Sequence, residues 1–260
     1  MGIYFDIVRF SFLRFFAYPY EILASVFKRV IEILFLILFW SLIVKESGGQ
    51  INISQIASYF FISMGIGDLV MSRWGPFGGE IGTQIKGGHI SNYLIKPVGI
   101  IPTLYSISFG RNGLRVLLAL INLTIGLIVY PPKGVISIIL FILFFISAWW
   151  IAFAYNLFQG TLFFHLTDAS GVRNALNNIV RVFSGEMVPL YLFPLALGQF
   201  IRFTPFPSMI YGPTVALSIN SFNQEVMINL GISIFWAIFL NIMVYMFWKK
   251  SIKNYEAIGI

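Results

Sequence analysis

The chain has 260 residues, of which 58% are hydrophobic, 18% are aromatic and only 10% are charged. A soluble globule of this size needs far more surface charge than 17 basic and 10 acidic residues can supply. The mean hydropathy of +0.85 points the same way. The composition therefore predicts an integral membrane protein. It excludes a disordered chain, a soluble enzyme and a nucleic-acid-binding protein.

Side chains that bind metals or attack substrates are scarce. The absence of cysteine excludes disulfides, thiolate metal sites and cysteine nucleophiles, and His89 and His165 are the only histidines. We therefore expect this chain to bind no metal or cofactor of its own. A secretory signal peptide is not predicted, because Asp6, Arg9 and Arg14 interrupt the first apolar residues.

Six segments have the length and apolar character of membrane-spanning helices, which need about 20 mostly apolar residues. The fourth is the clearest because it carries no charge, and the fifth is the weakest. The third is strongly apolar only after Arg115, so Arg111 and Arg115 are expected at its entrance, reaching toward water. The six predicted spans are residues 25–44, 55–74, 104–130, 135–158, 172–192 and 227–248.

The basic residues predict the orientation of these spans. With a cytoplasmic N-terminus, fourteen Lys and Arg residues lie inside, and only Lys45, Lys133 and Arg202 lie outside. Because basic residues accumulate in cytoplasmic loops, both termini are expected to be cytoplasmic.

Residues 1–20 form an aromatic and basic stretch whose charges recur too often for a span. We predict an amphipathic helix that lies in the cytoplasmic membrane interface and ends near Pro19. The alternative is a long cytoplasmic extension of the first span.

Common catalytic motifs are missing. The chain contains no G-x-x-x-x-G-K-[ST] loop, no H-E-x-x-H and no G-x-S-x-G. A multi-span chain without chemistry of its own is most often a transporter subunit, a channel or a scaffold. Any energy for uphill transport must then come from an ion gradient or from a partner.

An ordered set of short motifs follows the fifth predicted span: Ser184-Gly185, Pro189-Leu190, Phe193-Pro194, Pro205-Phe206 and Tyr211-Gly212-Pro213. This set resembles the signature of ABC-2 type permeases of bacterial exporters, in the branch related to viologen and drug exporters. The inner segment GHISNYLIKPVG, residues 88–99, is similar to that family's loop, in which a polar strip leads into Tyr-Leu-x-(Lys/Arg)-Pro. In length and span count the resemblance covers the whole chain.

The resemblance implies a single all-α domain of six transmembrane helices over residues 1–260, located in the bacterial cytoplasmic membrane. It implies pairing with a second ABC-2 permease, as a homodimer or heterodimer. It also implies two separate ABC ATPase subunits on the cytoplasmic side, which would bind the ATP and Mg. Two half-helices would enter the outer leaflet between spans five and six.

Residues 186–225 are the predicted outer re-entrant segment, which contains five of the eleven prolines. An apolar stretch rich in proline cannot cross as one helix, and broken backbone at membrane depth must be buried in protein or line a cavity. The alternative is an ordinary outer loop, but LYLFPLALGQFI is too apolar for a solvated loop. The residues expected to form the motif are Gly185, Pro189, Pro194, Pro205 and Pro213.

Residues 75–102 are the predicted cytoplasmic coupling loop, because a transporter driven by a partner needs a rigid connection between that partner and its spans. The polar candidates for this role are Glu80, Gln84, Lys86 and His89. The alternative is a solvated loop whose glycines serve turns. A metal-binding or proton-relay role for His89 is not expected, since no second ligand lies nearby in the sequence.

Polar residues also recur at helical spacing on span five, and one acidic residue lies in span two. A polar stripe is expected to face a partner helix or a water-filled path rather than lipid. We expect Asp68 to pair with Arg181 or Arg73 and to close the inner half of a substrate pathway. The alternative is a structural pair that joins helices. The predicted pathway residues are Asp68, Arg173, Asn177, Arg181 and Ser184.

We interpret the chain as the permease subunit of an ATP-driven exporter for an amphipathic drug-like, lipid-linked or peptide substrate. Two alternatives stay open. One is an ion-coupled secondary transporter that uses Asp68 or Glu32 as its proton site, although no internal repeat is visible. The other is a non-transporting membrane scaffold or immunity protein. At the mouth of span one, Lys28 and Glu32 are expected to form an i,i+4 pair.

Overall fold

The structure, a computed structural model, describes residues 2–13, 19–46, 52–71, 75–95, 97–166, 168–219, 221–253 and 255. All regular elements within these residues are helical, which confirms the predicted all-helical fold class for the described part. Two stretches are long and apolar enough to cross a membrane, Val135–Phe164 and Gln224–Lys253. A third candidate is a pair of helices bent by 64°, Ile100–Arg111 and Gly113–Val129.

The α-helices are α1 (Gly2–Leu13), α2 (Pro19–Glu46), α3 (Ile53–Leu69), α4 (Pro76–Lys86), α5 (Ile90–Leu94), α6 (Ile100–Arg111), α7 (Gly113–Val129), α8 (Val135–Thr161), α9 (Ser170–Phe183), α10 (Leu195–Arg202), α11 (Phe206–Met209), α12 (Tyr211–Ala216) and α13 (Gln224–Lys253). Within the described residues, two 3₁₀ turns follow, η2 (Leu162–Phe164) and η3 (Leu190–Leu192).

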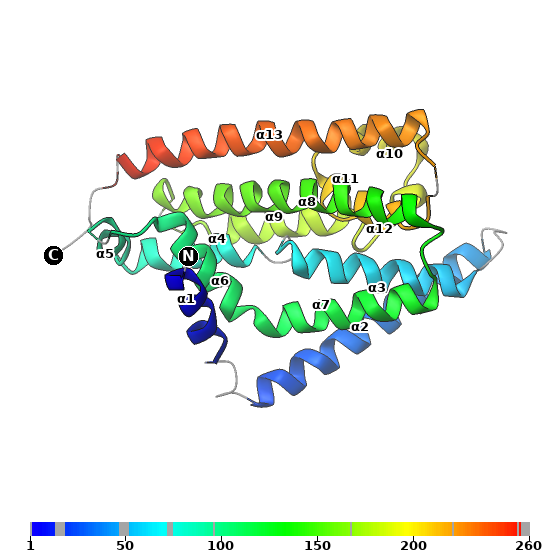
Figure 1. The fold of residues 1–260 in the computed structure, drawn as a ribbon, viewed down its shortest axis with the longest axis horizontal. Helices are drawn as coiled ribbons and strands as arrows, with labels where there is room; N and C mark the ends of the chain where they lie inside the picture. Colours follow the sequence, from blue (N-terminus) through cyan, green and yellow to red (C-terminus); the bar gives the residue numbers. More distant parts are fainter. Residues whose placement is uncertain are drawn as a thin grey trace.

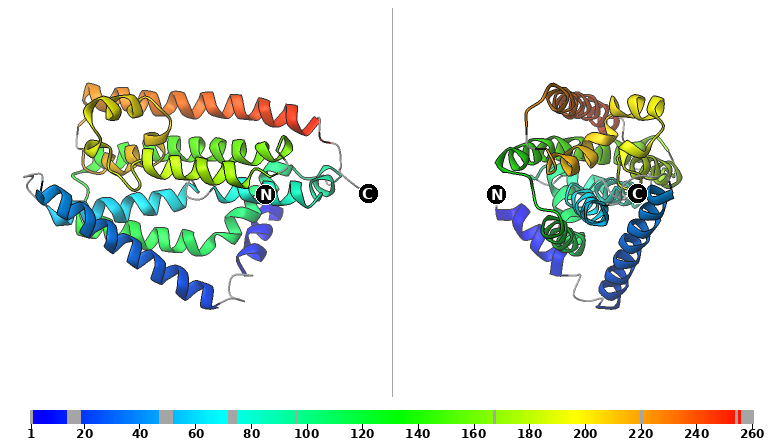
Figure 2. Two further views of the ribbon diagram at one scale, coloured as in Figure 1. Left: turned by 180° about the vertical axis from the view of Figure 1, so that it is seen from behind. Right: turned by 90° about the vertical axis from the view of Figure 1, so that its right-hand side faces the viewer.

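The long helices run roughly along one axis, with α2 inclined at the edge of the bundle (Figure 1). One end of the molecule holds α4, α5 and the C-terminal end of α13, and α1 lies in the same half (Figures 1 and 2). The opposite end holds α10, α12 and the N-terminal end of α13. We call these the α4 end and the α12 end.

Three of the predicted spans differ from the helices in the structure. The third, residues 104–130, is broken at Asn112 into α6 and α7, directly after one of the arginines expected at its entrance. The second ends at Leu69 rather than at residue 74, and residues 72–74 lie outside the described part. The fifth, residues 172–192, ends as a helix at Phe183, because Gly185 has a positive φ of 88° that a right-handed helix does not accept.

The N-terminal segment forms the predicted helix over Gly2–Leu13, and residues 14–18, up to the expected end near Pro19, lie outside the described part. It packs against α6, where the Tyr4 hydroxyl accepts a hydrogen bond of 3.3 Å from the Gly99 amide. Because α1 and α2 run in different directions, α1 is not a continuation of the first long helix (Figure 2).

The predicted inner loop is largely helical and packed rather than solvated. Helix α4 lies against α8 and α6, and Phe77 and Ile81 on it are fully buried. They share a core with Ile90 of α5, Leu104 of α6 and Trp248 of α13. The α4 end is therefore built as one packed layer.

Helices α3 and α7 approach each other closely through small residues. A Cβ atom on Gly65 would lie 2.8 Å from Cγ of Leu123 and 2.9 Å from the backbone oxygen of Ala119. Within a bilayer, helices associate through such close van der Waals packing because lipid is as apolar as their side chains.

We therefore predict that Gly65→Ala destabilises the protein by about 1–3 kcal/mol through overpacking. Gly231→Ala is the matched control, because nothing lies within 4 Å of its added Cβ. Unfolding of the detergent-solubilised protein by a denaturing detergent measures both. Equal stability of the two variants would show that α3 and α7 are not in this close contact.

Candidate functional site

A buried ion pair joins the first two long helices. The Arg29 guanidinium of α2 contacts the Asp68 carboxylate of α3, and their side chains are only 10% and 1% exposed. The prediction that Asp68 pairs with Arg181 is wrong, because that arginine binds other carboxylates. Arg73, the other expected partner, lies outside the described residues.

Arg181 of α9 connects to the same region from a third helix. Its Nη2 lies 2.8 Å from Oε1 of Glu32 on α2. Its Nε lies 3.7 Å from Oε1 of Glu186, a fully buried residue. Glu32, which the sequence placed beside Lys28, is thus an acidic partner of Arg181.

We call Arg29, Glu32, Asp68, Arg181 and Glu186 the ionic cluster. Its residues come from α2, α3, α9 and the turn after α9. A buried charge is costly unless an opposite charge and hydrogen bonds compensate it, so each arginine requires its carboxylates in place. The cluster consequently ties the inclined helix α2 to the rest of the bundle.

The turn formed by residues 184–187 is held by hydrogen bonds from the same helices. The Tyr59 hydroxyl of α3 donates to the Gly185 carbonyl at 2.5 Å. The Trp40 indole of α2 donates to the Met187 carbonyl at 2.8 Å. Ser184 is buried, and its carbonyl accepts a bond of 3.0 Å from the Tyr211 amide. The first predicted motif residues therefore form a fixed structural junction.

The remaining stripe residues of α9 face neighbouring helices. The buried Asn177 side chain accepts a hydrogen bond of 2.7 Å from Gln159 of α8. The Arg173 guanidinium lies against α4, where a Cβ atom on Gly79 would be only 2.0 Å from its Nη1. Of the two environments expected for this stripe, Arg173 and Asn177 thus occupy the one formed by partner helices.

Two ion pairs organise the α4 end. Glu80 is buried, and it pairs with Arg111 at 2.5 Å and accepts a hydrogen bond of 2.9 Å from Gln84. The exposed Lys86 pairs with Asp168 at 2.6 Å. Hydrogen bonds from Lys86 and Ser170 hold the pKa of Asp168 well below its usual range, so this carboxylate stays charged at neutral pH.

The four coupling candidates therefore divide into two groups. Glu80 is buried in the interior of the bundle, where its ion pair with Arg111 connects α4 to α6. Gln84 donates a hydrogen bond to Glu80. Lys86 and His89 lie on the exposed surface of the α4 end. A partner on this side can reach the second group and not the buried Glu80.

Several prolines of the predicted re-entrant segment, residues 186–225, stand at the starts of its short helices. Pro189, Pro194 and Pro205 directly precede η3, α10 and α11, where a missing backbone N–H is tolerated. Pro213 is buried in α12, which packs against α8 together with α11. Most of the segment is thus helical, with α11 and α12 packed against α8 and with several large apolar side chains of η3 and α10 exposed.

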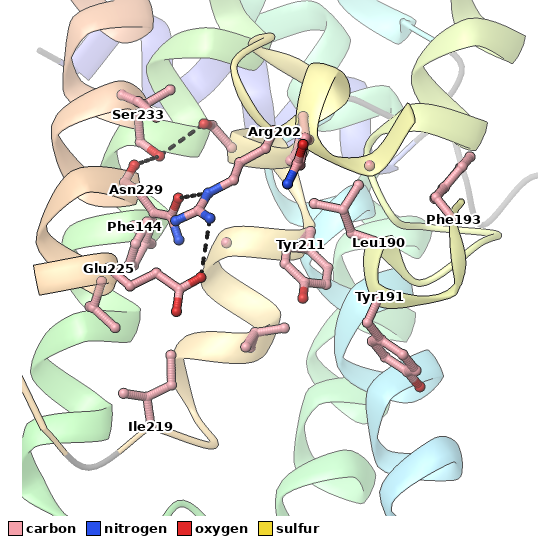
Figure 3. A pocket seen from close by; sticks show the side chains of 18 of the residues that line it. Phe144, Leu190, Tyr191, Phe193, Arg202, Tyr211, Ile219, Glu225, Asn229 and Ser233 are labelled. Carbon is pink, nitrogen blue, oxygen red and sulfur yellow. Dashed lines mark hydrogen bonds and ion pairs between the residues drawn. The ribbon is translucent and has the colours of Figure 1, made fainter. Parts of the chain in front are cut away.

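A cavity of about 460 Å³ lies between this segment, α8 and the start of α13 (Figure 3). Its wall is mainly apolar and aromatic, with Phe144, Tyr191, Phe193 and Tyr211 among the lining residues. Arg202 supplies the charged side, where its Nε lies 2.7 Å from Asn229 Oδ1 and its Nη1 lies 3.2 Å from Glu225 Oε1. The cavity can therefore hold a molecule that combines a large apolar part with a polar group.

Sequence reasoning named Asp68 and Arg181 but missed Arg29 and Glu186 as their partners. One signal was available, since Arg29 and Glu32 lie about one turn apart directly before the apolar run of residues 33–44. No comparable sequence pattern indicated that Arg202 and Glu225 would line a cavity. Among the described residues, no group of three or more His, Asp or Glu side chains is placed to hold a metal ion.

A comparison with models of protein families finds a family to which the chain is similar. The family model described as ABC-2 family transporter protein matches residues 28–259, almost the whole chain. No curated protein shows significant similarity to the sequence.

We predict that Arg29→Gln destabilises the protein by about 3–5 kcal/mol, because it leaves the Asp68 carboxylate buried without its cation. The double variant Arg29→Gln with Asp68→Asn should recover a large part of this loss, since neither charge then remains. Lys45→Gln, at the exposed end of α2, is the control and should be neutral. Denaturant titration of the unchanged protein, Arg29→Gln, Asp68→Asn, the double variant and Lys45→Gln measures these differences, and simple additivity of the two single changes at Arg29 and Asp68 would contradict the pairing.

Proposed function

The chain belongs to the ABC-2 transporter family, and from this premise we propose that it is the permease subunit of an ATP-driven exporter. Family membership makes it a membrane transport component. In this proposal the chain crosses the bacterial cytoplasmic membrane six times, with both termini in the cytoplasm. A separate ABC ATPase hydrolyses the ATP.

The ionic cluster supports six crossings, because it explains how the charged helix α2 can enter the membrane. Two further crossings are assigned to α3 and α7, whose 17 residues each rise about 25 Å, close to the hydrocarbon thickness of about 30 Å. Helices α8 and α13 supply two more. The remaining crossing combines α9 with the packed segment after Gly185, which we assign to the outer leaflet as the re-entrant part.

The α4 end is the proposed docking face for the ATPase. It carries the chain's C-terminal lysines and the exposed Lys86 and His89, in agreement with a cytoplasmic position. Helix α4 is suited to transmit force, because the pair between Glu80 and Arg111 joins it to α6 and its buried face joins it to α8. The ATP and Mg are bound by the partner in this scheme.

The proposed substrate is amphipathic. The cavity beside Arg202 supports this class, since its aromatic wall suits an apolar body and its polar side suits a hydrogen-bonding group. The ionic cluster closes the inner half of the proposed route between two permease copies, in the form of a homodimer or heterodimer. Pairing of Asp68 and Glu32 with arginines favours this role over that of a proton site in an ion-coupled carrier.

The single observation that carries the proposal is the family match over residues 28–259. The direct test is purification of the tagged chain from its native membrane in mild detergent. We predict that an ABC ATPase copurifies and that a variant with Lys86→Glu and His89→Glu recovers severalfold less of it, because both changes place a negative charge on the docking face.

Lys133→Glu, at the α12 end, is the matched charge reversal and should leave the recovery unchanged. If no ABC ATPase copurifies, the chain works as a self-sufficient carrier or a scaffold and the proposal fails. Equal loss from both variants would remove the α4 end as the docking face.

A further inference from the structure

A second cavity, of about 730 Å³, lies along the side of the bundle toward the α4 end. It forms a groove between the start of α6, the second half of α8 and the last turns of α13. The lining side chains are apolar or aromatic except at Asn241 and Lys249. The residues are Gly99, Ile100, Ile101, Pro102, Trp150, Phe153, Ala154, Leu157, Asn241, Ile242, Val244, Tyr245, Met246, Trp248 and Lys249.

The interior of the groove is predominantly apolar, and the amide nitrogen of its one Asn side chain is already bonded to the backbone. The Asn241 amide donates hydrogen bonds to the Trp150 carbonyl at 2.9 Å and to the Ala237 carbonyl at 2.7 Å. The rim is open to the side, since Ile242 and Met246 are 58% and 66% exposed. In a membrane protein such a rim faces hydrocarbon, so the matching occupant is an alkyl chain rather than a hydrophilic molecule.

The end of the groove is cationic. The Lys249 ammonium lies 4.7 Å above the ring of Tyr245, which holds it at the groove's mouth. Lys250 and Lys253 follow in the last turn of the same helix. Within the described residues, none of these three lysines forms an ion pair with a carboxylate. The apolar groove therefore ends in positive charge that no carboxylate of the described residues neutralises.

We propose that this groove binds one anionic phospholipid, with an acyl chain along α13 and the phosphate at Lys249. Asn241 and Lys249 are eight residues apart, a rise of about 12 Å from the groove's interior to its charged end. Along the groove, apolar side chains give way to aromatic side chains and then to basic ones. A phospholipid changes in the same direction, from its acyl chain through the interfacial region to its charged headgroup. A zwitterionic headgroup lacks the net charge that the lysines require.

Bound lipid would act on the packing of the α4 end. Phe153 lines the groove on one side and stacks on Phe77 of α4 on the other, with ring centroids 5.6 Å apart. Trp248, also in the wall, packs edge-on against Phe164 at 5.4 Å. An occupied groove thus supports the core on which α4 rests. This site requires only that the chain is embedded in a membrane, so it does not depend on the proposed transport function.

Native mass spectrometry of the full-length protein tests the site, with phosphatidylglycerol and phosphatidylcholine of identical acyl chains as probes. We expect one phosphatidylglycerol to bind more tightly than phosphatidylcholine. Lys249→Gln should weaken phosphatidylglycerol binding about fivefold, the effect of one basic residue beside an anionic headgroup. Lys133→Gln, at the opposite end, removes the same charge and should change nothing.

A second variant tests the groove itself. Met246→Trp adds bulk at an exposed position of the wall, so it should fold normally and weaken the binding of both lipids. Equal affinity for the two lipids would overturn the proposal, because the headgroup charge would then play no part in binding. Equal effects of the two lysine changes would overturn it as well, by showing only a general attraction of the anionic lipid to basic protein. Undiminished binding to the Met246→Trp protein would place the lipid elsewhere and overturn it too.

Discussion

The structure depends on the pairing of charges inside an apolar bundle. Helix α2 carries Lys28, Arg29 and Glu32 directly before a long apolar run, and alone in hydrocarbon these charges would be strongly unfavourable. Asp68 and Arg181 supply the opposite charges from α3 and α9. Because charge and counter-charge sit on different helices, the bundle is complete only when all three helices are in place.

The same helices connect the two ends of the molecule. The turn at residues 184–187 is bonded to α2 and α3, and the Tyr211 amide binds its first carbonyl. It therefore joins the ionic cluster to the packed segment that lines the outer cavity. At the other end, α9 meets α4 through Arg173 and through the pair between Lys86 and Asp168. A displacement of α4 would thus be transmitted along α9. The proposed permease, driven by a partner at the α4 end, requires such a connection.

The sequence alone predicted a helix closely where the apolar composition of that helix is sufficient to identify it. The uncharged run within residues 135–164 and the apolar run before Lys249 predicted α8 and α13 closely, because burial in lipid depends on composition alone. The sequence did not predict the positions of helix ends that depend on packing against neighbouring elements. The break at Asn112 falls beside Arg111 and Gly113, and α9 ends at Phe183 just before Ser184-Gly185, yet hydropathy averaged over the length of a span located neither of these helix ends.

Ion-pair partners were harder still, since they depend on which helices pack together. Spacing on α9 selected Arg181 correctly as a residue turned inward, but it contained no information that Glu32, 149 positions earlier, would meet it. Glu80 was expected on the surface because it lies in a polar loop sequence, yet the fold buries it against Arg111. Helical periodicity reports which face is polar and leaves the identity of the opposing residue undetermined.

The most direct test of the account is whether α2 crosses the membrane. The chain has no cysteine, so single cysteines can be introduced on either side of this helix, at Tyr20→Cys and Ser54→Cys. A membrane-impermeant maleimide should label Ser54→Cys in intact right-side-out vesicles and Tyr20→Cys only after the vesicles are opened. Labelling of both positions in intact vesicles, or of neither, would place both ends of α2 on one side and contradict the pairing of its charges within the bilayer.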